Sequence, residues 1–160
     1  MKLGKPVRFL VSIVACYIAA GLGSVFTTSQ IATWYLSLHK PPFNPPNWIF
    51  GPVWTLLYTL MGISLYLVWT TTAQRTKKLK KTAIQYFILQ LLFNSLWSIV
   101  FFGMHAPLAA FVVIVGLWFS ILVTITKFWT INKLAGQLLI PYILWVTFAS
   151  VLNFAVVLLN

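Results

Sequence analysis

The chain has 160 residues, of which 61% are hydrophobic, 17% aromatic and 7% charged, whereas soluble domains average roughly 45–50% apolar and 25% charged residues. All eleven charged residues are Lys or Arg, which gives a formal net charge of +11. Because Asp and Glu are absent, the composition excludes paired-carboxylate glycosidases, Ser-His-Asp triads, two-metal phosphoryl-transfer sites and Ca²⁺-binding loops. Cys16, His39 and His105 are too few and too far apart for a closed zinc site, so we expect no bound metal.

Five apolar runs are each long enough to cross a bilayer, which takes about 20 residues. They are too long and too continuous for barrel strands, in which apolar and polar residues alternate over about ten positions. We therefore predict an all-α fold in which a single domain, residues 1–160, forms a membrane bundle. Its five transmembrane helices are expected at about 9–27, 49–70, 83–103, 108–128 and 138–159.

The first run has a basic head, an apolar stretch and Cys16, a combination that also resembles a signal peptide with a lipoprotein cleavage site. We favour a spanning helix because apolar and small residues continue as far as Phe26. Small residues recur in steps of four at Ala15, Ala19 and Gly23. Such a stripe is typical of membrane helices that pack closely against a neighbour, and we assign it mainly to packing.

The connection between the first two runs is unusually rigid. Four of six consecutive positions are proline, namely Pro41, Pro42, Pro45 and Pro46. Proline fixes its own φ and biases the preceding residue towards extended conformations. Two interpretations are open. The segment is either a lid over the bundle, since long ordered loops are usually functional, or an interfacial loop whose Trp and Tyr side chains lie among lipid headgroups.

Aromatic and amide side chains share one face of the second, third and fifth predicted helices. Helical spacing aligns Trp54 with Tyr58, then Gln90 with Asn94, Trp97 and Ser98, and lastly Tyr142 with Trp145, Ala149 and Asn153. An amide in hydrocarbon needs a partner, so the amides of these helices are expected to face inward. The stripes are interpreted either as hydrogen bonds that hold the bundle together or as a cavity with aromatic walls, suited to a large flat ligand.

Basic residues fall in alternate connections. Ten of the eleven lie in the N-terminus, the second connection and the fourth connection, and only Lys40 lies on the opposite side. Since Lys and Arg near spans favour the cytoplasmic side, we predict a cytoplasmic N-terminus in a bacterial cell membrane. In an organellar membrane the same argument holds, but the compartments on the two sides would have other names. The run from Arg75 to Lys81 is interpreted as an anchor on anionic membrane lipid, and nucleic acid is discarded as a partner.

From Trp34 to Tyr58 the sequence resembles the signature of the translocator protein, or tryptophan-rich sensory protein, family, formerly the peripheral benzodiazepine receptors. The resemblance continues through residues 90–97, 101–103, 139–145 and 152–153, and so covers nearly the whole chain in order. It implies a five-helix membrane protein, often a homodimer, with a pocket beneath the first loop. Porphyrins, sterols and synthetic isoquinoline or benzodiazepine-type molecules are the ligands that it implies.

The resemblance also implies which residues form this pocket. The matching positions are Tyr35, Pro45, Trp54, Tyr58, Asn94, Trp97, Ser98, Trp145 and Ala149. Trp54 and Trp145 are the expected porphyrin contacts, and Lys40 at the rim is a candidate partner for a propionate. Porphyrin is expected as a ligand, and no cofactor is expected. Phe154 stands at the Tyr position of the C-terminal cholesterol motif of eukaryotic members and no basic residue follows it, which favours a bacterial member.

Three functions are compatible with these expectations. The first is a sensory or translocator protein that binds tetrapyrroles, with no catalytic residue. The second is light- or oxygen-dependent degradation of porphyrin, for which Trp54 and Trp145 are the candidate redox groups. The third is transport of porphyrin or sterol, against which stand the lack of a clear inverted repeat and of any intramembrane carboxylate. Binding is therefore favoured.

Overall fold

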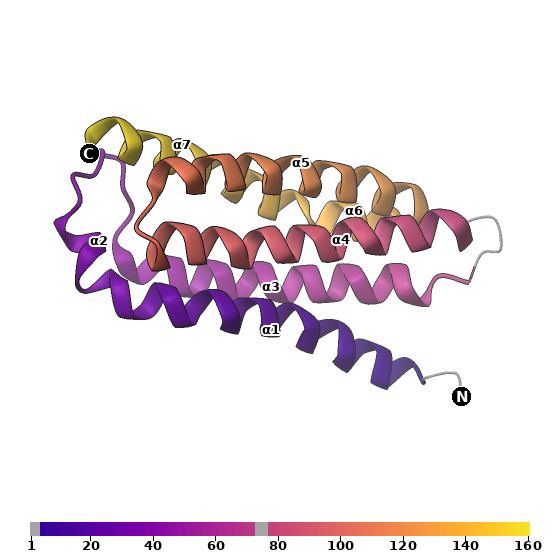
Figure 1. Ribbon diagram of the computed structural model, residues 1–160. Helices are drawn as coiled ribbons and strands as arrows, with labels where there is room; N and C mark the ends of the chain where they lie inside the picture. The colour runs from indigo at the N-terminus through magenta and orange to yellow at the C-terminus, as the bar shows by residue number, and fades with distance from the viewer. Residues whose placement is uncertain (1–3, 73–76) are drawn as a thin grey trace.

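The computed structural model describes residues 4–72 and 77–160, and within these ranges it consists of helices without strands (Figure 1). The helices are α1 (Lys5–Ile31), α2 (Trp34–Ser37), α3 (Asn47–Thr70), α4 (Lys77–Ser98), the π-helix η2 (Ile99–Gly103), α5 (Pro107–Ile131), α6 (Lys133–Leu138) and α7 (Ile140–Leu159). Five stretches are long and apolar enough to cross a membrane, with α4 joined to η2 and α6 to α7. The predicted all-α fold with five spans is confirmed, and the chain is an integral membrane protein.

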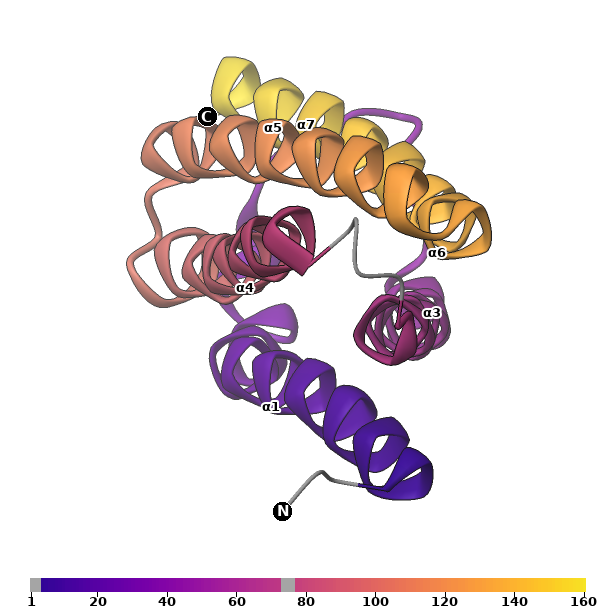
Figure 2. The same ribbon diagram turned by 90° about the vertical axis from the view of Figure 1, so that its right-hand side faces the viewer.

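The long helices run side by side, with α2 and the C-terminus at one end of the bundle and the N-terminus at the other (Figure 1). Seen along the bundle, α1 lies below α3 and α4, and α5 and α7 lie above them (Figure 2). The starts of α1, α4 and α6 and the end of α5 share the N-terminal end, so the described basic residues of these segments gather there. Lys2 and Arg75 lie outside the described residues, and the orientation across the membrane stays a prediction.

The helices extend beyond the predicted spans or break inside them. The first runs from Lys5 to Ile31, because polar residues at both ends continue the helix outside the apolar stretch. The last span is divided at Leu139. Pro141 has no N–H to donate to the preceding turn, and the Leu139 amide bonds instead to the Gly136 carbonyl three residues earlier, at 3.2 Å.

Close helix approach depends on glycine. A Cβ at Gly62 of α3 would lie 2.6 Å from Cδ1 and 3.0 Å from Cα of Ile13 in α1, and one at Gly23 would lie 3.0 Å from the Ser98 hydroxyl oxygen of α4. The Ser95 hydroxyl also donates to the Ala19 carbonyl at 3.1 Å. The small-residue stripe predicted in the first helix therefore does pack against α4, as membrane helices with small residues do.

Candidate functional site

A cavity of about 630 Å³ lies inside the bundle at the end nearer α2. Residues of α1, α2, α3, α4, η2 and α7 line it, and none of the lining residues belongs to α5. The volume falls within the range of roughly 300–1,000 Å³ that is usual for small-molecule sites. The cavity therefore has the size of a ligand pocket, which favours the second interpretation of the aromatic stripes.

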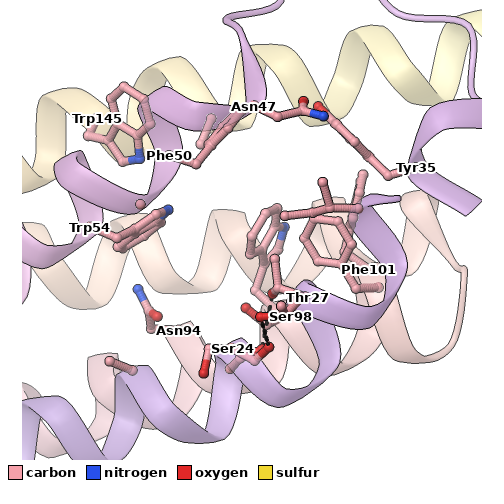
Figure 3. A pocket seen from close by; sticks show the side chains of 18 of the residues that line it. Ser24, Thr27, Tyr35, Asn47, Phe50, Trp54, Asn94, Ser98, Phe101 and Trp145 are labelled. Carbon is pink, nitrogen blue, oxygen red and sulfur yellow. Dashed lines mark hydrogen bonds between the residues drawn. The ribbon is translucent and has the colours of Figure 1, made fainter. Parts of the chain in front are cut away.

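The structure brings eight of the nine predicted site residues to this cavity. They are Tyr35, Trp54, Tyr58, Asn94, Trp97, Ser98, Trp145 and Ala149. Trp54 and Trp145 line the same space, with Phe50 beside Trp145 and Asn94 below Trp54 in the view of Figure 3. The positions implied by the family resemblance, most of which also share the aromatic and amide faces, thus lie on the cavity wall, while ligand contact at each of them stays a prediction.

Pro45 is described by the structure but does not line the cavity. Its carbonyl accepts a hydrogen bond from the side-chain amide of Asn44 at 3.1 Å. Of the whole proline-rich connection, Tyr35 at one end and Asn47 at the other are the residues that reach the cavity. The loop thus covers the end of the bundle but contributes little of the wall.

A chain of buried hydrogen bonds joins α3, α4 and α7 behind the cavity wall. The Tyr58 hydroxyl donates to Oδ1 of Asn94, and Nδ2 of Asn94 donates to the Tyr142 hydroxyl at 2.9 Å. That hydroxyl donates in turn to Oε1 of Gln90 at 2.9 Å. Gln90 is 1% exposed and Tyr142 is 1% exposed, so water does not compete, and the network fixes Tyr58 and Asn94 at the cavity floor.

A second set of bonds fixes the α2 side of the wall. The indole N–H of Trp97 donates to Oδ1 of Asn153 at 2.9 Å, and Nδ2 of Asn153 donates to the Pro107 carbonyl at 2.9 Å. The prediction that the amides face inward is confirmed, since Gln90, Asn94 and Asn153 are all buried. The hydrogen-bonding interpretation therefore also holds, because the same amides join the helices and line or support the cavity.

One polar atom at the cavity has no partner among the described residues. It is Nε1 of Trp145, which is buried and makes no hydrogen bond. Its ring contacts Phe50 and Phe148, at centroid distances of 6.0 and 5.6 Å. A buried indole N–H normally finds an acceptor, so Trp145, whose ring lines the cavity, keeps a buried hydrogen-bond donor without a partner among the described residues.

The α2 end of the cavity is closed by aromatic packing. Tyr35 is buried against Phe101 and Phe102, and its hydroxyl donates to Oδ1 of Asn44 at 2.8 Å. Burial raises the pKa of the Tyr35 phenol, and the hydrogen bond to Asn44 partly opposes this. The ammonium of Lys40 lies 4.9 Å from the centre of the Tyr35 ring, so the cation predicted at the rim lies next to the cavity without lining it.

The cavity wall itself is uncharged. No Lys, Arg or His is among the lining residues that the structure describes, and the chain has no Asp or Glu. Within the described ranges there is also no group of His and Cys residues able to hold a metal ion. Such a wall can bind by burial, stacking and neutral hydrogen bonds.

Sequence reasoning missed the contribution of the first helix. Tyr17, Gly21, Ser24 and Thr28 of α1 all line the cavity. Their spacing of i, i+4, i+7 and i+11 was visible as one face of small and polar residues. That face lies beside the packing stripe, and a stripe of small residues does not by itself distinguish helix contact from an open wall.

Comparison with known proteins decides the family. The profile of the TspO/MBR family matches residues 12–159. The chain belongs to the TspO/MBR family. The resemblance found in the sequence is thereby confirmed, and so is the five-helix architecture that it implied.

Relatives in this family come from all three domains of life. The chain is 45% identical to the tryptophan-rich protein TspO of Archaeoglobus fulgidus over 96% of its own length and 97% of that protein. It is 40% identical to the tryptophan-rich protein TspO of Chlorobaculum tepidum over 99% of each chain. The human translocator protein is 34% identical over 84% of this chain and 79% of its own. The similarity to these two TspO proteins thus extends over nearly the whole chain.

Proposed function

We propose that this membrane protein binds porphyrins and related flat aromatic molecules, including isoquinoline and benzodiazepine-type compounds, in the cavity between α1, α3, α4 and α7. The observation that carries the proposal is the convergence of Trp54 and Trp145 from two different helices on one uncharged cavity. Membership of a family whose relatives are named translocator and tryptophan-rich sensory proteins supports it.

Affinity would come mainly from burial and stacking. Trp54 already contacts Tyr58 and Tyr142, at centroid distances of 5.6 and 6.3 Å, so its ring is held before any ligand arrives. Each aromatic pair contributes about 0.5–1.5 kcal/mol beyond the area that it buries. Preorganised rings also reduce the entropy lost on binding, which suits a rigid ligand.

Orientation would come from a few polar groups. The unpaired and buried Nε1 of Trp145 would donate to an acceptor on the ligand once the ring turns towards it. The Asn94 amide and Ser98 hydroxyl lie elsewhere on the wall. The acid groups of a porphyrin have no cation in the wall to meet, so they are expected to project from the cavity. Lys40, over the Tyr35 ring, is the cation placed to receive one of them at the α2 end.

The test is a titration of the purified protein with protoporphyrin IX in the dark, which separates binding from photochemistry. Saturable quenching of tryptophan emission and a shift of the porphyrin absorption band are expected. The double variant Trp54→Phe/Trp145→Phe should weaken binding by about tenfold or more, since two stacking contacts and one donor are lost. Trp129→Phe on α5, which leaves the cavity wall unchanged, is the matched control. Absence of saturable binding, or equal affinities of the double variant and the control, would refute the proposal.

A further inference from the structure

Two facing stripes of residues on α1 and α3 both line the cavity and are exposed on the surface of the bundle. On α1 they are Tyr17, Gly21, Ser24 and Thr28, and on α3 they are Trp48, Gly51 and Thr55. Each stripe follows one helical face, in steps of three or four residues. We name the gap between them the lateral opening.

The glycines of the lateral opening are not used for helix packing. A Cβ built at Gly21 or at Gly51 meets nothing within 4 Å, whereas one at Gly23 or Gly62 would meet a neighbouring helix at 3.0 Å or less. Glycine thus serves close approach at Gly23 and Gly62, but at Gly21 and Gly51 it leaves space. The space lies beside the cavity, because both residues line it.

The lateral opening faces the hydrocarbon of the bilayer. On α1, Tyr17, Gly21 and Ser24 each precede a strongly exposed apolar side chain, since Ile18, Leu22 and Val25 are 59%, 56% and 69% exposed. On α3, Leu56 beside Thr55 is 57% exposed. Ten residues separate Gly21 from the end of α1 at Ile31, which corresponds to about 15 Å along the helix. The opening therefore lies within the apolar span, in the half of the membrane nearer α2.

Hydroxyl groups along the opening are compatible with lipid. Ser24 donates to the Gly21 carbonyl at 2.9 Å, Thr28 to the Ser24 carbonyl at 2.8 Å and Thr55 to the Gly51 carbonyl at 2.9 Å. None of these donors is left unsatisfied in hydrocarbon, where the cost would be high. Their oxygens can still accept a hydrogen bond from a passing molecule.

Tyr17 lies at the edge of the lateral opening that is further from α2. Its hydroxyl is 2.9 Å from the Thr59 hydroxyl oxygen and donates to the Thr55 carbonyl at 3.3 Å. These contacts join α1 to α3 along the line where the two helices meet, which we call the seam. Further from α2, the seam is closed by the tight approach of Gly62 to Ile13. The two helices thus meet on one side of Tyr17 and leave the cavity open on the other.

We propose that ligands enter and leave the cavity sideways, from the bilayer, through the lateral opening between α1 and α3. The inference rests on the proposed binding function and specifies its substrate class: an apolar, flat molecule already dissolved in the membrane, any acid groups of which remain at the headgroups. The proline-rich connection then covers the water-facing end, and the route through the lipid-facing side needs no movement of that loop.

The experiment measures binding rates of protoporphyrin IX by stopped-flow quenching of tryptophan emission, with the protein in lipid nanodiscs. Gly21→Phe and, separately, Gly51→Leu place bulk in the opening from its two sides. Leu22→Phe adds an aromatic ring to the neighbouring lipid-facing position and is the matched control. For both opening variants we expect association and dissociation to slow together, by about tenfold, with the dissociation constant changed less than about threefold. The control should keep wild-type rates.

The outcomes separate the route from the site. Wild-type rates in both opening variants would overturn the lateral route while leaving the binding function intact. Faster dissociation with unchanged association would also overturn it, because bulk that only weakens the bound state is not a barrier to passage. Failure of the wild-type protein to bind protoporphyrin saturably would overturn the proposed function, and this inference with it.

Discussion

Removal of the Tyr142 hydroxyl tests whether the buried polar network stabilises the bundle. Tyr142→Phe deletes an oxygen that accepts from Asn94 and donates to Gln90, each at 2.9 Å. Both partners are buried, so neither can turn to water when the hydroxyl is lost. Asn94 retains its bond from Tyr58, and Gln90 retains a long contact of 3.8 Å to the Met61 sulfur.

The expected loss follows from the two bonds. A hydrogen bond between membrane helices contributes about 0.6 kcal/mol on average and about 1.7 kcal/mol at most, so two of them give a loss of about 1–3 kcal/mol. Denaturation by SDS in mixed micelles, followed by tryptophan fluorescence, measures the change in the free energy of unfolding. Tyr66→Phe is the control, because the Tyr66 ring packs on Phe9 and its hydroxyl forms no hydrogen bond in the described structure. A difference below about 0.5 kcal/mol between the two variants, within the range of ordinary surface substitutions, would refute the reasoning.

Three further predictions address packing, the loop and the topology. Gly62→Ala should destabilise the folded protein by about 1–3 kcal/mol, because the new Cβ would overlap Ile13. Gly21→Ala has open space around its Cβ and should stabilise the protein by up to about 1 kcal/mol through helix propensity. Thermal unfolding in detergent compares the two variants, and equal effects would contradict the packing described at Gly62. Asn160 accepts from the His39 amide at 3.0 Å and donates to the His39 carbonyl at 3.1 Å, so Asn160→Ala should speed hydrogen exchange at His39 while Leu158→Ala does not. Alkaline phosphatase fused after Asn160 and expressed in a bacterial inner membrane should be active if the N-terminus is cytoplasmic, and an inactive fusion would reverse the orientation.

The five spans were predictable because each depends on a local property, the length of an apolar run. The break at Leu139 and the extra helix α2 were not, since both depend on a few residues inside a longer pattern. Pro141 gives a signal for the break, but proline is often tolerated inside membrane helices. Hydrophobicity therefore locates a span better than it locates the ends of a helix.

The π-helix η2 also lay beyond sequence reasoning. The Met104 amide bonds to the Ile99 carbonyl at 2.9 Å, five residues back. Phe101 and Phe102, which lie within this wider turn, both line the cavity. Such π-helical turns are rare overall, but those that occur are often found at functional sites. No residue type predicts where one will form.

The aromatic and amide residues of the cavity wall could be predicted from the sequence, but the small residues could not. Asn94 stood out because an amide in hydrocarbon needs a partner, and Trp54 and Trp145 stood out because they share such faces and match the family signature. Gly21 and Ser24 did not stand out, because small residues serve both helix contact and open walls. Only the three-dimensional position of α3 relative to α1 distinguishes the two uses, and that position depends on long-range packing at Gly62.

We propose that a flat aromatic ligand lies against Trp54 and Trp145 in the uncharged cavity. A structure of the protein with bound protoporphyrin IX in lipid would show where the ligand lies. We expect the macrocycle against both indole rings, an acceptor within hydrogen-bond distance of Nε1 of Trp145, and the acid groups outside the cavity. A porphyrin bound on the outer surface of the bundle, with the cavity between Trp54 and Trp145 unoccupied, would contradict it.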